Sequence, residues 1–249
     1  MENDMNSSYK IADFHVGVFS GTKFPRIMLL GYSHSGKSGA VKTICHSLKG
    51  EYRQVFVHAI SEPQEKFYET FIPPNRISSE RNFDKLCKTY EEHRKRKKLY
   101  ETKVASGEMS MDKAQKECQM LIILDDLDFL GNRVFYDNTI NKIWMNGHDD
   151  WITVVATLHS TEGVGPIVRD RSDWIVAFSD SSVADQKRLY EKWIRHFPSF
   201  RAFKEVYSSI TSEHGCMVAC KLRGDKTNVE SNIFSWVPSQ VEESFNFKP

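Results

Sequence analysis

Residues 31–38 read Gly-Tyr-Ser-His-Ser-Gly-Lys-Ser and directly follow the apolar run Ile27-Met28-Leu29-Leu30. These eight residues complete the pattern G-x-x-x-x-G-K-[ST], which is typical of a loop that binds phosphate groups between a strand and a helix. The glycines let the backbone curl so that successive N–H groups point at phosphate oxygens, and the start of the next helix adds a positive dipole. The apolar run predicts the strand before the loop, and residues 40–48 predict the helix after it.

The chemistry of this loop predicts ATP and Mg²⁺ as cofactors. Lys37 is expected to reach the β and γ phosphates, and Ser38 to ligate the metal through its hydroxyl. A glycine-rich turn without nucleotide is the alternative, which the flanking strand and helix disfavour. The residues expected to bind nucleotide are Gly31, Tyr32, Ser33, His34, Ser35, Gly36, Lys37, Ser38 and Gly39.

Length and composition predict one α/β domain. The chain has 249 residues, 40% of them hydrophobic, which is enough for one large core. We expect a loose segment at residues 1–12 and a single domain at 13–249. The formal net charge of +1 gives no global reason to expect a polyanion or a membrane as partner. Five cysteines without C-x-x-C spacing favour reduced thiols, and no uncharged apolar run approaches the roughly 20 residues that span a bilayer.

Further apolar runs predict a mostly parallel central sheet flanked by helices. Short apolar runs bounded by polar residues are typical of buried parallel strands. Two tail strands separated by Gly224-Asp225 predict a C-terminal β-hairpin. The expected strands are 25–30, 55–60, 120–124, 152–158, 174–178, 216–222 and 232–237, and the expected helices include 137–145, 184–197 and 200–210.

Residues 81–118 form a charged stretch that predicts a helical insertion. An interruption at Ser106-Gly107 divides it into expected helices at 81–105 and 110–118. Its centre, residues 94–98, reads Arg-Lys-Arg-Lys-Lys and is the densest positive run in the chain. Such a run is either a solvated helix face, with glutamates at helical spacing as partners, or a contact for nucleic acid. Both interpretations stay open from the sequence.

An acidic pair follows the strand Leu121-Ile122-Ile123-Leu124. Because this strand ends at the carboxyl edge of the sheet, Asp125 is expected to hold the Mg²⁺ that Ser38 also ligates. Asp126 is expected to accept a hydrogen bond from a water and to orient it for attack on the γ phosphate. The alternative role for Asp126 is a cap on the turn before Leu127.

Two further groups complete the expected site. The strand 152–158 delivers His159 to the same edge, either as a sensor of the γ phosphate or as a passive loop histidine. Phosphoryl transfer also develops negative charge that an arginine stabilises, often from a neighbouring subunit. Arg133, Arg169 and Arg171 are the candidates for that arginine.

The motifs in this order resemble the poxvirus-type genome-packaging ATPases of the FtsK–HerA superfamily, which occur in large nucleocytoplasmic DNA viruses and virophages. The similarity covers residues 24–195. The segments that carry it are Gly-Tyr-Ser-His-Ser-Gly-Lys-Ser, Leu-Ile-Ile-Leu-Asp-Asp-Leu, Ile-Thr-Val-Val-Ala-Thr-Leu-His and Pro-Ile-Val-Arg-Asp-Arg-Ser-Asp. The last segment, at its distance after the His159 strand, makes the match more specific than a phosphate loop alone.

The resemblance implies a RecA- or FtsK-like P-loop fold and an ATP-hydrolysing motor that packages double-stranded viral DNA. It also implies a homo-oligomeric ring, capsid proteins as partners, and a location in the host cytoplasm, the viral factory or the virion. Two departures stand out. His159 lies where such motors usually carry a glutamine sensor, and residues 146–150 lack the usual arginine before that strand. A trans-acting arginine would therefore be Arg169 or Arg171, or would be absent.

Two other classes of protein, an enzyme and a non-catalytic nucleotide switch, also use a phosphate loop. A small-molecule or nucleoside kinase would need a lid, for which residues 81–118 could serve, but adjacent acids suit water activation better than an acceptor alcohol. A GTPase-type switch is disfavoured because the chain has no Asn-Lys-x-Asp sequence.

Overall fold

The computed structural model describes residues 9–222, 225, 227–239 and 245–247. Residues 1–8 of the expected loose segment and Gly224 of the expected turn therefore lie outside the described part. The strand β1 (Ala12–Asp13) begins at the last residue of that expected loose segment.

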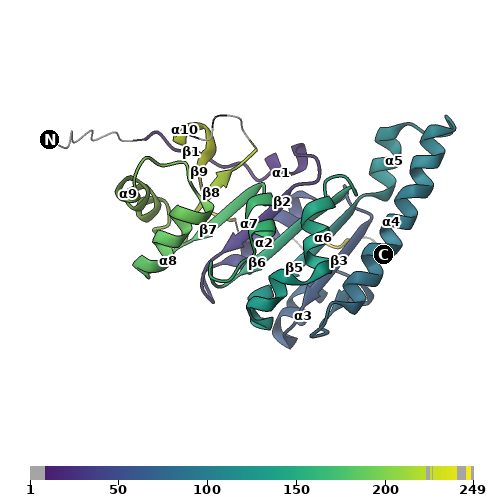
Figure 1. The fold of residues 1–249 in the computed structure, drawn as a ribbon, viewed down its shortest axis with the longest axis horizontal. Coiled ribbons are helices and arrows are strands. Elements are labelled where there is room, and N and C mark those ends of the chain that lie inside the picture. The colour runs from purple at the N-terminus through teal and green to yellow at the C-terminus, as the bar shows by residue number, and fades with distance from the viewer. Residues whose placement is uncertain (1–8, 223–224, 226, 240–244, 248–249) are drawn as a thin grey trace.

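The described strands form one twisted sheet in the order β1-β9-β8-β7-β2-β6-β5-β3-β4 (Figure 1). Neighbouring strands are parallel except for the β7–β8 and β8–β9 pairs. The predicted α/β fold with a mostly parallel sheet is confirmed. The strands after β1 are β2 (Arg26–Leu30), β3 (Gln54–Ala59), β4 (Ile77–Ser78), β5 (Met120–Asp125), β6 (Ile152–Leu158), β7 (Trp174–Phe178), β8 (Cys216–Cys220) and β9 (Ile233–Trp236).

Helices cover both faces of the sheet, because alternate strand residues point to opposite sides. Ile122 packs in one apolar layer with Ile143 and Phe203, whereas Ile123 packs in the other with Val41 and Ile44. The helices are α1 (Val18–Gly21), α2 (Lys37–Ser47), α3 (Glu62–Glu69), α4 (Asp84–Ala105), α5 (Met111–Cys118), α6 (Asn138–Asn146), α7 (Pro166–Arg171), α8 (Val183–Arg188), α9 (Phe200–Ile210) and α10 (Val229–Asn232).

Two predicted elements near the C-terminus differ in detail. The antiparallel pairing of β8 with β9 is as predicted, but α10 lies in their connection, so the two strands are not joined by a tight turn alone. The expected helix at 184–197 is α8 followed by a π-helical turn, Leu189–Trp193, in which the Ile194 N–H donates to the Leu189 carbonyl. The regular helix is therefore shorter than predicted.

The charged insertion forms α4 and α5, which lie side by side at the right-hand end of the view in Figure 1. Most side chains of its basic run, residues 94–98, contact other residues of the same chain. Arg94 lies 3.5 Å from Asp150, Arg96 donates to the Gln54 side chain, and Lys97 pairs with Glu101. Only Lys95 and Lys98 of the five are exposed. This packing favours the helix-face interpretation over a contact for nucleic acid.

None of the helices in the described part of the chain combines the length and apolar character needed to span a bilayer.

Candidate nucleotide-binding site

The phosphate loop lies between β2 and α2, as predicted, at the carboxyl edge of the sheet. Gly36 has a φ of +104°, a backbone conformation that favours glycine. At Gly31 a Cβ atom would lie 2.7 Å from the Phe178 Cβ and 2.7 Å from the Ser35 hydroxyl oxygen. Both glycines of the motif are therefore required by the local geometry.

A cavity of about 490 Å³ opens beside this loop. Three expected nucleotide-binding residues, Gly31, Tyr32 and Ser35, do not line it; the Tyr32 hydroxyl instead donates to Asp180 at 2.8 Å. Residues from three other elements complete the wall. The lining residues are Ser33, His34, Gly36, Lys37, Ser38, Gly39, Ser61, Gln64, Asp126 and His159.

Lys37 is buried and folds back onto the loop. Its Nζ donates to the carbonyl oxygens of Gly31 at 2.6 Å and Tyr32 at 2.8 Å. Burial lowers the pKa of this amine, and the negative charges of Asp126 and Asp125 oppose that shift. The two carbonyl oxygens thus hold the ammonium beside the loop. Phosphate oxygens could replace them there as its hydrogen-bond acceptors.

Asp125 is the last residue of β5 and is 3% exposed. Burial, followed by the charge of Asp126, raises the pKa of its carboxyl to about 6, and the Thr157 hydroxyl, which donates to it at 2.6 Å, counteracts the shift. Since a cation would favour the ionised form, this carboxyl suits a metal ligand. No cluster of three or more His, Cys, Asp or Glu side chains able to hold a metal exists among the described residues. The Ser38 hydroxyl and the Asp125 carboxylate would fit Mg²⁺ without such a cluster, because phosphate oxygens and water can supply its remaining ligands.

Asp126 points its carboxylate into the network around the cavity. Its Oδ1 lies 2.8 Å from the His159 Nε2 and 3.1 Å from the Thr157 hydroxyl oxygen, while its Oδ2 accepts from the Gln64 amide. Its side chain makes no capping hydrogen bond to the following turn. The geometry therefore disfavours the interpretation of Asp126 as a simple cap.

His159 connects the acidic pair to the phosphate loop. Its Nδ1 lies 3.2 Å from the Ser33 hydroxyl and 3.3 Å from the Lys37 Nζ, on the opposite side of the ring from Asp126. The sheet order explains this position, because β6 lies between β2 and β5 and so ends between the loop and the acids. The Asp128 carboxylate fixes the turn by accepting the His159 N–H at 2.8 Å.

Comparison with known proteins agrees with this architecture. The family model described as "Poxvirus A32 protein" matches residues 13–190. The chain belongs to the poxvirus A32 protein family. The resemblance to the poxvirus-type packaging ATPases and the assignment as a P-loop ATPase are confirmed.

Viral relatives and solved structures are similar over most of the chain. Protein L437 of Acanthamoeba polyphaga mimivirus is 26% identical over 90% of this chain and 75% of its own length. Protein 088R of Invertebrate iridescent virus 3 is 24% identical over 76% of this chain and 66% of its own length. The genome packaging NTPase B204 of Sulfolobus turreted icosahedral virus 2, in complex with ATP-gammaS, has a TM-score of 0.57 at 14% identity, covering 88% of this chain and 99% of that one. The pCW3 conjugation coupling protein TcpA has a TM-score of 0.62 at 11% identity, covering 91% and 63%.

The candidate arginines of this A32-family ATPase do not line the cavity. Arg169 and Arg171 lie in the last turn of α7, and Arg169 pairs with Asp170 at 3.1 Å. Because α7 ends where β7 begins, both residues lie toward the edge of the sheet opposite the phosphate loop. The side chain of Arg133 lies outside the described part. No arginine lines the cavity among the residues described.

Two residues of the site were not predicted from the sequence. Gln64 is the third residue of a capping box in which the Ser61 N–H donates to the Gln64 amide oxygen at 3.1 Å. The pattern Ser-x-x-Gln signals such a helix start, but nothing in it signals the second contact, with Asp126. Thr157 was predicted only as a strand residue, because its contact with the acids depends on the order of the strands.

Proposed function

We propose that this A32-family ATPase is a motor that couples ATP hydrolysis to the packaging of double-stranded viral DNA. The continuous network from Lys37 through His159 to Asp126 carries this proposal, since it joins the phosphate loop to the residue positioned to activate water. Family membership supports the packaging role. Structural neighbours described as a genome packaging NTPase and a conjugation coupling protein are consistent with it.

In this proposal each side chain of the network has one role. Lys37 leaves the loop carbonyls to bind the β and γ phosphates. Ser38 and Asp125 hold Mg²⁺, which when bound neutralises charge on the phosphate oxygens. Asp126 accepts a hydrogen bond from the attacking water and orients it. His159 contacts both Lys37 and Asp126, which supports a role in sensing the γ phosphate over that of a passive loop histidine.

We further propose that the protein acts as a homo-oligomeric ring around DNA. The support is the cavity itself, which no arginine of the described residues lines, so a charge-stabilising arginine would come from a neighbouring subunit. Arg169 or Arg171 would supply it. Capsid proteins are the proposed assembly partners, and the host cytoplasm or viral factory, with possible retention in the virion, is the proposed location. We treat residues 13–249 as one functional domain.

Measuring ATP hydrolysis with and without double-stranded DNA tests the proposed function. Strong stimulation by DNA is the expected result for a translocating motor. A phosphate transferred to a nucleoside, with no effect of DNA, would instead support the kinase alternative and overturn the proposal.

Two substitutions test the roles within the network. Lys37→Ala is expected to abolish nucleotide binding or turnover, because it removes the cation for the phosphates. Asp126→Asn is expected to leave nucleotide binding intact and to lower turnover by about 100-fold or more, as expected for loss of a general base. Calorimetry with a non-hydrolysable ATP analogue and a phosphate-release assay separate the two effects. Normal hydrolysis by the Asp126→Asn variant would show that the assigned role is wrong.

A further inference from the structure

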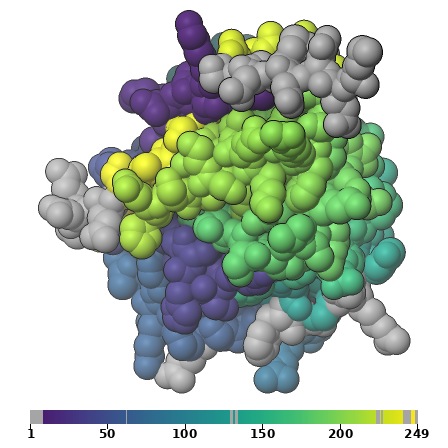
Figure 2. Space-filling view, turned by 90° about the vertical axis from the view of Figure 1, so that its left-hand side faces the viewer, coloured from purple at the N-terminus to yellow at the C-terminus, as the bar shows by residue number. Residues whose placement is uncertain are grey.

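Thr157 is a polar residue in a strand that is otherwise mostly apolar. All seven residues of β6 are buried, and Thr157 is 0% exposed. Figure 2 looks onto the end of the molecule that carries α8 and α9, whose green atoms form much of that surface, whereas β6 lies inside the sheet between β2 and β5. A buried hydroxyl is unfavourable unless it forms hydrogen bonds, so its partners indicate its role.

The Thr157 hydroxyl joins the two acidic residues at the end of β5. It donates to the Asp125 carboxylate at 2.6 Å and accepts the backbone N–H of Asp126 at 2.8 Å. Because a hydroxyl has a single hydrogen, this donation leaves none for the Asp126 Oδ1, which lies 3.1 Å away. Thr157 therefore holds the side chain of Asp125 and the backbone of Asp126.

The hydrogen bond to the backbone is important because Asp126 has an unusual conformation. Its φ of +51° lies in the left-handed region, which residues other than glycine seldom adopt unless their surroundings hold them there. The side chain of Asp126 lines the nucleotide cavity. The acceptor that Thr157 supplies thus stabilises the turn from which this carboxylate reaches the cavity.

Thr157 is itself held by hydrogen-bonded strands on both sides. β6 pairs with β5 on one side and with β2 on the other, where Leu29 is the partner of Thr157. A side chain on such a frame is positioned more accurately than one on a loop. The same strand ends one residue before His159, so the frame that positions the acids also carries that histidine.

We infer that Thr157 is a positioning residue for ATP hydrolysis, which fixes the Asp125 carboxylate relative to the backbone of Asp126. The inference rests on the proposed roles of these two acids, one toward Mg²⁺ and one toward the attacking water. Thr157 is not among the residues that line the nucleotide cavity, so it acts through the acids. Misplacement of a reacting group by about 1 Å can slow a reaction by about 100-fold, so the loss of this hydroxyl should affect turnover.

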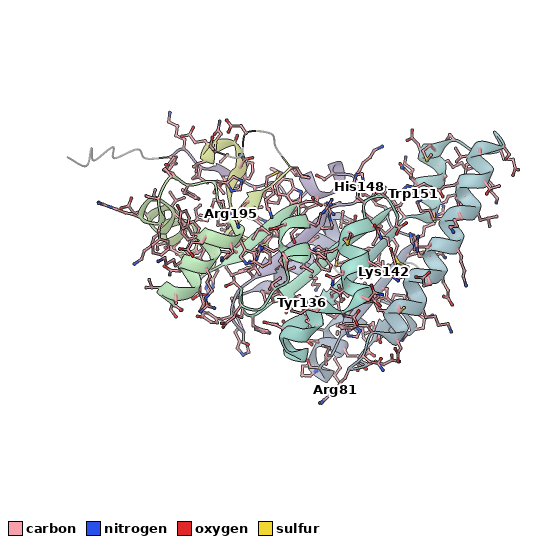
Figure 3. The ribbon with its side chains drawn as sticks, in the orientation of Figure 1. Arg81, Tyr136, Lys142, His148, Trp151 and Arg195 are labelled. Atoms are coloured by element: carbon pink, nitrogen blue, oxygen red, sulfur yellow. The ribbon has the colours of Figure 1, made fainter. Side chains whose placement is uncertain are left out.

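Three variants separate positioning from a merely structural role. Thr157→Val keeps nearly the same shape but lacks the hydroxyl, whereas Thr157→Ser keeps the hydroxyl. The matched control is Thr153→Val on the same strand, since Thr153 is also 0% exposed and its hydroxyl lies 2.5 Å from that of Tyr52. Figure 3 labels Trp151, which directly precedes β6, so Thr153 lies toward the end of the strand that is remote from the cavity.

The first test measures ATP hydrolysis without DNA. Thr157→Val is expected to lower kcat by about tenfold or more and to change KM for ATP by less than about twofold. Thr157→Ser should keep kcat within about threefold of the wild type, and Thr153→Val should leave it unchanged. Both valine variants should unfold at lower denaturant concentration, because each leaves a buried partner without its hydrogen bond. Equal kcat values in the two valine variants would overturn the inference.

The second test needs neither nucleotide nor metal. Amide hydrogen exchange followed by NMR should show that the Asp126 N–H is protected in the wild type and in Thr157→Ser. In Thr157→Val this N–H should exchange faster by about tenfold or more. Free exchange of the Asp126 N–H in the wild type would overturn the inference even if the valine variants did not fold.

The outcomes also separate this inference from the proposed function. Normal hydrolysis by Thr157→Val, together with an inactive Asp126→Asn variant, would overturn the role of Thr157 and leave that of Asp126 standing. Normal hydrolysis by Asp126→Asn would overturn both roles. Because DNA is absent from both tests, neither result depends on whether the ATPase is a packaging motor.

Discussion

Three side chains contact the Asp126 carboxylate, and they come from different parts of the chain. Gln64 lies in the first turn of α3, Thr157 in β6 and His159 directly after β6. The sequence predicted Asp126 and His159, because each follows an apolar strand that ends at the same sheet edge. It did not predict Gln64, which is 62 residues away from Asp126 and whose capping role alone explains its residue type.

We expect Gln64→Glu to slow ATP hydrolysis without unfolding the protein. A glutamate keeps the oxygen that accepts the Ser61 N–H, so the helix cap survives. It replaces the donor to Asp126 with a like charge, so the carboxylate that we propose orients water would be displaced. The expected result is a fall in kcat of about tenfold or more, with KM for ATP and the melting temperature nearly unchanged.

Gln64→Ala serves as the comparison, because it removes both the acceptor for the Ser61 N–H and the donor to Asp126. It should lower kcat and also destabilise the fold by about 1 kcal/mol, measured by denaturant unfolding. Wild-type kcat in Gln64→Glu would show that Gln64 only caps α3.

At the scale of elements, the strands were predictable but their order was not. Buried parallel strands such as β5 and β6 consist mostly of apolar residues, a pattern that is visible in the sequence. The insertion of β6 between β2 and β5 depends on packing across the whole sheet, and it is this order that places His159 between the phosphate loop and the acids. The basic run of α4 was ambiguous for the same reason, since Arg94 and Arg96 contact Asp150 and Gln54, which are remote in sequence.

Lys97 of α4 is expected to stabilise the fold rather than to bind DNA. Its ammonium lies 5.0 Å from the centre of the Trp151 ring and pairs with Glu101. Lys97→Met should therefore lower the free energy of unfolding by about 1 kcal/mol and leave the salt slope of DNA binding unchanged. Lys98→Met, at the exposed neighbour on the same helix, should change neither quantity. A smaller salt slope in Lys97→Met would indicate a phosphate contact instead.

His93 makes the docking of α4 sensitive to acid. It is fully buried, its Nε2 lies 2.7 Å from the Asp150 carbonyl, and burial lowers the pKa of its imidazole to about 4 from an ordinary 6.5. Because the folded-state pKa is the lower one, the unfolded chain takes up the proton first. The stabilising contribution of neutral His93 is therefore present above about pH 6.5 and is lost as pH falls toward about 4.

Unfolding by denaturant at several pH values between 7 and 4 checks this expectation. His93→Gln should reduce the loss of stability on acidification, by roughly 1.4 kcal/mol for each pKa unit of the shift. An unchanged pH dependence in His93→Gln would show that His93 does not titrate in this way. His58, whose pKa burial also lowers to about 4, would then be the next histidine to replace.

On the scale of the whole molecule, the sequence was enough to predict the fold and the sheet edge at which the phosphate loop and the acidic pair lie. It was not enough to predict where the candidate arginines lie relative to that edge. The phosphate loop and the acidic pair lie at one edge of the sheet because parallel strands bring their carboxyl ends together. Arg169 and Arg171 were predicted by residue type and motif alone, and α7 carries them toward the other edge. If Arg169 or Arg171 acts in phosphoryl transfer, as we propose, a neighbouring subunit would have to bring it to the nucleotide site.

Mixing two inactive variants tests whether a neighbouring subunit supplies the arginine. Lys37→Ala has a defective nucleotide site but intact arginines, and the double variant Arg169→Ala/Arg171→Ala has the reverse defect. In a mixed ring, the intact site of one subunit meets the intact arginines of the next, so hydrolysis stimulated by DNA should partly return. Mixing Lys37→Ala with Asp126→Asn should restore nothing, because both defects affect the same site of each subunit. Full activity of the double arginine variant by itself, or no recovery in the first mixture, would exclude these arginines as the trans-acting group.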